Sequence, residues 1–174
     1  MLILNQRTEQ AATDTVALGY DERKRSRLKV TLSSGREAGI FLERGEHLHG
    51  GDKLAAEDDH AVVEIHAAPE SLIEAYADTP LLFARAAYHL GNRHVPVQIV
   101  AQTGGGLLRF QADHVLAEMV RGLGCIIGET KVPFEPEAGA YGGQHHHAAA
   151  PAAPHDPGHG PHRAVPKIHQ FKSR

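Results

Sequence analysis

The order of apolar and polar residues along the first third of the chain predicts β-strands and turns. Residues 28–32 alternate apolar and polar side chains, a Ser-Ser-Gly turn follows them, and residues 38–42 return, which is typical of a β-hairpin. Residues 61–66 alternate in the same way and predict a further strand. No helical periodicity is visible before residue 68, so we expect a small all-β domain over residues 1–68.

Beyond Pro69 the pattern changes, and segments with strand and helix periodicity alternate. The expected strands are residues 71–76, 95–100, 107–111 and 125–134, and the expected helices are residues 80–90 and 114–123. For the second helix we expect a cap at Asp113, a stop at Gly124 and an apolar stripe formed by Val115, Leu116, Met119, Val120 and Leu123. Their β-α-β-β-α-β order is that of the ferredoxin-like fold, in which two helices cover one face of an antiparallel sheet. We therefore predict an α+β chain with a ferredoxin-like domain over residues 69–142.

The first of these helices leads to a histidine. Pro80 suits a first helical turn after a cap at Asp78 or Thr79, and Gly91 is expected to end the helix in the left-handed conformation. The next residues turn the chain into a strand, so His94 stands on a corner with a fixed backbone and a projecting ring. A metal ligand would fit this position, and so would a turn histidine without a function.

Histidines are also frequent after residue 142, where Gly, Ala, Pro and His make up most of the sequence. No periodic apolar face remains, so we expect residues 143–174 to form a disordered tail. Half of the chain's 14 histidines lie there, namely His145, His146, His147, His155, His159, His162 and His169. Neutral imidazole suits nickel, copper, zinc and cobalt, which favours metal capture. An expression tag or neutral low-complexity sequence is the alternative, although a tag is usually one unbroken run.

Three other histidines are weaker candidates for metal ligands. His114 follows Asp113 at the start of the second helix, a position that suits a ligand and that an exposed first-turn residue explains equally well. His47 and His49 would point to one side of an extended segment and could chelate an ion. We interpret both as solvated polar residues beside a glycine turn.

Composition and charge narrow the class of protein. The formal net charge of -3 at pH 7 argues against a nucleic-acid binder, since such proteins usually carry a basic face. Residues 23–27 form a local basic run, which we interpret as a solvated hairpin face or as a docking surface for an acidic partner. Cys125 is the only cysteine, so the chain can form neither an internal disulfide nor a thiolate cluster.

Apolar runs and sequence motifs argue against a secreted protein, a membrane protein and an enzyme. The apolar run at the first residues is too short for a secretory signal and no run reaches the length of a membrane span, so we expect a cytoplasmic protein with no membrane partner. The chain has no Gly-rich phosphate loop, no Gly-x-Ser-x-Gly elbow and no His-Glu-x-x-His motif. We therefore expect a binding protein and not an enzyme.

Three runs of sequence resemble a known family. They are Tyr-His-Leu-Gly-Asn-Arg-His-Val-Pro-Val-Gln-Ile (residues 88–99), Asp-His-Val-Leu (113–116), and Pro-Phe-Glu-Pro-Glu-Ala-Gly-Ala-Tyr (133–141) before a His-rich end. Together with Arg-Gly-Glu-His-Leu-His-Gly-Gly-Asp (44–52), they closely resemble the UreE family of urease accessory proteins, which are nickel metallochaperones. The resemblance covers residues 1–142. The tail is similar to those of the family in being rich in histidine, but it does not align with them.

This resemblance implies a peptide-binding-like β domain, a ferredoxin-like metal-binding domain and a homodimer. In the family, the histidine matching His94 comes from both subunits to share one nickel ion, and tail histidines complete its coordination. Nickel then passes to the urease activation complex through the accessory GTPase. Some members carry a further histidine two places before the position of His114, where this chain has Ala112.

From pattern and resemblance together we expect a cytoplasmic, homodimeric nickel carrier with no turnover chemistry, in which copper or zinc can replace nickel in vitro. Two alternatives remain open. A general zinc, copper or nickel buffer would bind through the tail regardless of His94, and a peptide-binding assembly scaffold would work without any histidine.

Overall fold

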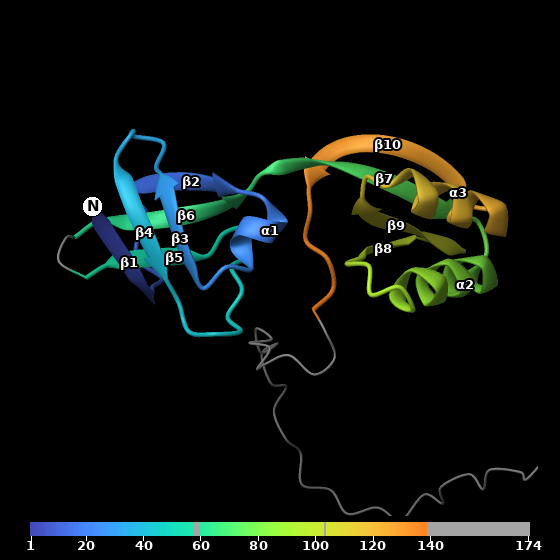
Figure 1. The fold of residues 1–174 in the computed structure, drawn as a ribbon, viewed down its shortest axis with the longest axis horizontal. Helices are drawn as coiled ribbons and strands as arrows, with labels where there is room; N and C mark the ends of the chain where they lie inside the picture. Colours follow the sequence, from blue (N-terminus) through green and yellow to red (C-terminus); the bar gives the residue numbers. More distant parts are fainter. Residues whose placement is uncertain (58–59, 103, 139–174) are drawn as a thin grey trace, which may run out of the picture. The chain divides into compact units, whose positions relative to one another are not determined.

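The computed structural model describes residues 1–57, 60–102 and 104–138, and these residues form two β-sheets with three helices (Figure 1). The first sheet contains β1 (Leu2–Arg7), β2 (Asp14–Leu18), β3 (Arg27–Thr31), β4 (Glu37–Phe41), β5 (Lys53–Ala56) and β6 (Val62–Ala67) in the order β2-β6-β5-β1-β4-β3. The expected hairpin is β3 and β4, which pair antiparallel.

The first sheet curls into a barrel-like form around an apolar core. Leu4, Ile40, Leu54 and Ile65 are fully buried in this core. The turn after β3 closes onto the opposite edge strand β2, because the Ser33 amide donates a hydrogen bond of 2.9 Å to a β2 carbonyl. Alternating side chains produce this arrangement, since one face of each strand can be buried while the other stays in water.

A one-turn helix, α1 (Tyr20–Arg23), interrupts the strands of the first sheet. The Glu22 carboxylate accepts a hydrogen bond of 2.9 Å from the Gly19 amide, and the Gly19 carbonyl accepts one from the Arg23 amide. Sequence periodicity predicted no helix here, because four residues are too few to repeat a helical face.

The second sheet contains β7 (Pro69–Ala77), β8 (Gln98–Gln102), β9 (Gly105–Gln111) and β10 (Ile126–Pro133) in the order β10-β7-β9-β8, with every neighbouring pair antiparallel. The helices α2 (Pro80–Gly91) and α3 (His114–Leu123) complete the β-α-β-β-α-β sequence. They share one core with a face of the sheet, to which Ile73, Leu108, Ala86 and Val120 contribute. The predicted fold class, α+β with a ferredoxin-like second part, is therefore confirmed.

Local chemistry fixes both ends of α3. The Asp113 carboxylate accepts hydrogen bonds from the amides of Val115 (2.8 Å) and Leu116 (2.9 Å), and Gly124 ends the helix in the left-handed conformation with φ of 112°. These are the cap and the stop expected from the sequence. Val115, expected on the buried side of this helix, is exposed instead.

Glycine allows a helix of the second core to approach its sheet closely. A Cβ atom on Gly106 in β9 would collide with the ring of Phe83 in α2. Gly128 in β10, by contrast, has no neighbour within 4 Å of such an atom. Of these two strand glycines, only Gly106 therefore has to lack a side chain.

Candidate metal-binding site

His94 lies on a corner between α2 and β8 whose backbone is held by hydrogen bonds. The Leu90 carbonyl accepts from the amides of Arg93 (3.0 Å) and Val95 (3.3 Å), and the His94 amide donates to the Gly91 carbonyl at 2.9 Å. Leu90 is itself fully buried in the second core. The corner is therefore attached directly to the packed interior of its domain.

His94 has a φ of 55° and is the one non-glycine residue with positive φ in the part of the chain that the structure describes. Its side chain is exposed. The left-handed conformation costs an L-residue about 1–2 kcal/mol, although His tolerates it better than most residues. Strain of this kind persists where the surrounding structure enforces it, and it clusters at active sites and ligand clamps.

The expected left-handed stop at Gly91 was wrong, and His94 takes that conformation three residues later. Gly91 remains helical, and Asn92 follows it with φ of -62° and donates its amide hydrogen bond to the Tyr88 carbonyl. The next strand begins at Gln98 and not at residue 95, where it was expected.

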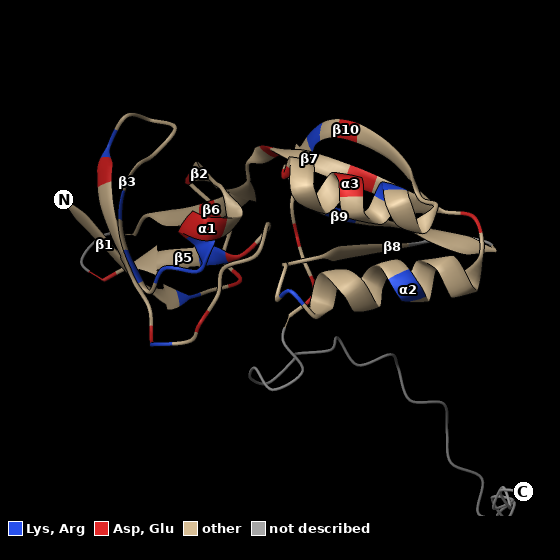
Figure 2. Ribbon diagram, turned by 45° about the vertical axis from the view of Figure 1, so that its right-hand side comes forward, with Lys and Arg blue, Asp and Glu red and all other residues tan. Residues whose placement is uncertain are grey.

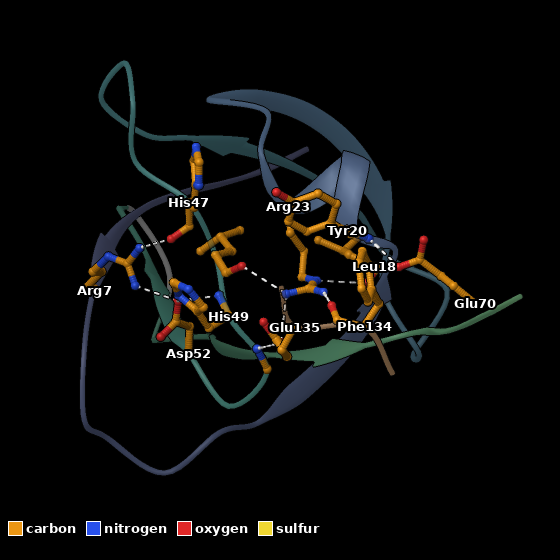
Figure 3. Close-up of polar contacts among 12 residues, drawn as sticks. Arg7, Leu18, Tyr20, Arg23, His47, His49, Asp52, Glu70, Phe134 and Glu135 are labelled. Atoms are coloured by element: carbon orange, nitrogen blue, oxygen red, sulfur yellow. Dashed lines mark hydrogen bonds and ion pairs between the residues drawn. The ribbon is translucent and has the colours of Figure 1, made fainter. Parts of the chain in front are cut away.

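The remaining candidate histidines of the described region lie on the surface. His114 is the exposed first residue of α3. His47 and His49 are both exposed, with backbone contacts to Arg7 and Asp52 (Figure 3). The Arg7 guanidinium donates to the His47 carbonyl at 2.8 Å, and the His49 amide donates to the Asp52 carboxylate at 2.8 Å.

Within residues 1–57, 60–102 and 104–138, no group of three or more His, Cys, Asp or Glu side chains is arranged to hold a metal ion. Neither His94 nor His114 therefore belongs to such a group among these residues. The seven predicted tail ligands, from His145 to His169, lie outside the described residues. The metal-ligand set consequently remains a prediction at every position.

Cys125 is a buried thiol just before β10 and is 4% exposed. Burial raises its pKa above the ordinary value, and the nearby Asp78 carboxylate adds to this effect. A raised pKa keeps the thiol protonated, so it is a poor nucleophile and a poor metal ligand at neutral pH.

The interpretation of residues 23–27 as a solvated face is wrong for Arg23, whose side chain is only 1% exposed, whereas Arg25 and Arg27 are exposed as expected. Its guanidinium contacts Glu135, which lies 112 positions away in the sequence (Figure 3). No local signal pointed to this contact. Elsewhere on the described chain, basic and acidic residues are interspersed over both sheets, as Figure 2 shows.

Comparison with known families assigns the chain to a class of protein. Residues 2–68 match the family model of the N-terminal domain of the UreE urease accessory protein, and residues 70–165 match that of its C-terminal domain. This class consists of accessory chaperones that act in urease maturation, and it is not a family of enzymes. Among the described residues, no helix is both long and apolar enough to cross a membrane.

Individual relatives lead to the same family. A urease accessory protein UreE from Dechloromonas aromatica (strain RCB) is 77% identical over 175 residues, which cover 100% of both chains. One from Pseudomonas putida (strain W619) is 52% identical, over 81% of this chain and 86% of its own. One from Burkholderia lata is 52% identical, over 79% of this chain and 64% of its own. The chain therefore belongs to the UreE urease accessory protein family and has a role in urease maturation.

Proposed function

We propose that the protein is a nickel metallochaperone that binds nickel through His94 and delivers it to the urease activation complex. The observation that carries this proposal is the conformation of His94. An exposed imidazole is held in a left-handed backbone on a corner bonded to the buried end of α2. A ligand fixed in this way loses little conformational freedom when an ion binds.

One imidazole leaves most coordination positions of a nickel ion open, so further donors are needed. We infer that they are the His94 of a second copy and histidines of the tail, and that His114 is a candidate for an additional contact. The complete proposed set is His94, His114, His145, His146, His147, His155, His159, His162 and His169. We infer that capture through the tail histidines is reversible, which suits transfer better than storage.

The outer face of α2 supports the proposed homodimer. Leu81 and Tyr88 are each 63% exposed and lie seven positions apart, which places them on the same side of the helix. His94 follows the end of this helix. A second copy covering these side chains would bury apolar area and would bring the two His94 corners toward each other.

The partner in this proposal is the urease accessory GTPase, and through it the urease activation complex. The family assignment supports this choice, because an accessory protein acts by contact with the maturation machinery. The cytoplasmic location expected from the sequence belongs to the same proposal.

Isothermal titration calorimetry with nickel tests the role of His94. Four proteins are compared: the full chain, the chain ending at Tyr141, His94→Ala, and the control His66→Ala, which removes another exposed imidazole. We expect the tightest site to disappear in His94→Ala, to weaken in the truncated chain, and to persist in His66→Ala. Equal tight binding by the full chain and His94→Ala would refute the carrier proposal and favour a general metal buffer.

Two further measurements separate the remaining alternatives. Sedimentation of the full chain with and without nickel should show a dimer, and a strict monomer with metal present would contradict a shared site. Binding to the purified urease GTPase should depend on nickel and on His94. Binding that persists after all histidines are replaced would favour an assembly scaffold.

A further inference from the structure

We propose that Arg23 is a positioning residue for metal binding, because it fixes the chain segment that leads to the His-rich tail beside the His94 corner. This inference rests on the proposed function, in which the tail and His94 contribute to one nickel site. It concerns residues 134–137, the chain segment that leaves β10 and leads toward the tail.

Arg23 holds this segment with a buried guanidinium (Figure 3). Its Nη1 donates to the Glu135 carboxylate at 2.8 Å and to the Leu48 carbonyl at 3.2 Å, and its Nη2 donates to the Phe134 carbonyl. Its Nε donates to the Leu18 carbonyl at 3.3 Å. The planar fork of arginine can reach four acceptors in this way, which a lysine ammonium cannot reproduce.

The two residues held by Arg23 are fixed by other contacts as well. Phe134 is fully buried, and its ring meets the ring of Tyr20 edge to face, with the centroids 5.4 Å apart. The Glu135 carboxylate also accepts a hydrogen bond of 2.8 Å from the Gly50 amide. Because a buried arginine without its carboxylate partner is strongly unfavourable, Arg23 and Glu135 keep each other in place.

Two residues further on, the same segment bonds to the His94 corner. The Glu137 amide donates a hydrogen bond of 2.8 Å to the Val97 carbonyl, and Val97 lies three residues after His94. The chain between Glu135 and Glu137 contains only Pro136, whose ring restricts its conformation. Fixing Glu135 therefore also favours the bond between Glu137 and Val97.

This attachment sets the length of chain between the fixed segment and the first tail histidine. His145 lies eight positions beyond Glu137, a distance of at most about 29 Å at about 3.3–3.6 Å per residue. If the segment were released, the free chain would begin at Pro133, twelve positions before His145. The effective concentration of a tethered ligand falls with roughly the 3/2 power of tether length, so lengthening the tether from eight to twelve positions should weaken capture by about twofold.

A comparison of variants with and without the tail tests this inference. Arg23→Lys and Glu135→Ala are each made in the full chain and in the chain ending at Tyr141, and Glu129→Ala, on an exposed residue of β10, is the control. Nickel affinity is measured by calorimetry with nickel alone as the probe. Amide hydrogen exchange at Glu137 is followed in the same proteins without metal.

We expect both variants to exchange faster at Glu137 and to bind nickel about twofold more weakly in the full chain. In the truncated chain, neither substitution should change the nickel affinity. Glu129→Ala should have the nickel affinity and the exchange rate at Glu137 of the wild type. Glu135 is partly exposed, so Glu135→Ala gives a result even if Arg23→Lys does not fold. A second pair of variants acts on the hydrogen bond itself. Glu137→Pro removes the N–H that is donated to Val97, and Glu137→Ala keeps it. Only the proline variant should weaken nickel binding.

Three outcomes would overturn the inference. Unchanged exchange at Glu137 would show that Arg23 does not hold the segment, and the proposed function would stand. Equal weakening in the full and truncated chains would show a general structural role, again without affecting the proposed function. If truncation itself left nickel affinity unchanged, the contribution of the tail and the positioning role would both be refuted.

Discussion

Replacing His94 by glycine should make the protein more stable while it abolishes nickel binding at this corner. The substitution removes the imidazole and also removes the steric conflict of a side chain in the left-handed conformation, where His94 has φ of 55°. His94→Ala removes the same imidazole but retains a Cβ atom. The two variants therefore lose the same ligand and differ in backbone strain.

The expected difference can be worked out from the geometry. An L-residue in the left-handed conformation costs about 1–2 kcal/mol, and the greater freedom of glycine in the unfolded chain offsets about 0.5–1 kcal/mol of the relief. The side chain is exposed at this position, so little packing is lost in either variant. His94→Gly should therefore exceed His94→Ala by about 0.5–1 kcal/mol in free energy of unfolding, or about 2–8 °C in the melting temperature of a domain of this size.

Urea unfolding in the presence of a chelator measures this difference, because metal then contributes nothing to the native state. Asn92→Gly is the control, since Asn92 has φ of -62° and glycine there should destabilise the protein by about 0.5–1 kcal/mol. Equal unfolding midpoints for His94→Gly and His94→Ala would refute the assignment of strain to this residue.

Three further predictions concern the fold. Asp113→Ala removes the cap of α3 and should lower the free energy of unfolding by about 1 kcal/mol, measured by urea unfolding. Gly106→Ala should lower it by about 1–3 kcal/mol by forcing a methyl group against the phenylalanine ring of α2, whereas Gly128→Ala should be tolerated. The Ser34 hydroxyl holds the pKa of Asp14 below its ordinary 3.8, so this interaction favours folding at neutral pH. The stability difference between the wild type and Asp14→Asn should therefore shrink as the pH falls below 3.8, as urea midpoints across acid pH would show.

The sequence was sufficient to predict the second sheet and its helices because their signals are local. Each helix has an apolar face and a polar cap, and the Asp113 cap and Gly124 stop lie where the pattern placed them. The corner was harder to predict. Gly91, Asn92 and His94 are all residue types that tolerate positive φ, so residue preference could not decide which of them takes it.

Arg23 could not be predicted because burial of a charge depends on partners that are distant in the sequence. Its neighbours Asp21 and Lys24 form a surface ion pair of 2.7 Å, and an exposed basic run was the natural interpretation. Only the fold brings Glu135 and the Phe134 carbonyl to the guanidinium. A sequence shows which residues are charged, but the energy of burying a charge is decided by its tertiary contacts.

Position 94 has to satisfy two demands, and few residue types meet both. The backbone requires a residue that tolerates positive φ, which favours Gly, Asn, Asp or His. The proposed function requires a nitrogen donor suited to nickel, which leaves His alone among these four. His94→Asn should therefore keep the conformation of the corner and the stability of the fold but lose nickel, whereas His94→Gly should gain stability and lose nickel. If His94→Asn unfolded as readily as His94→Ala, tolerance of the left-handed backbone would have no part in the choice of residue.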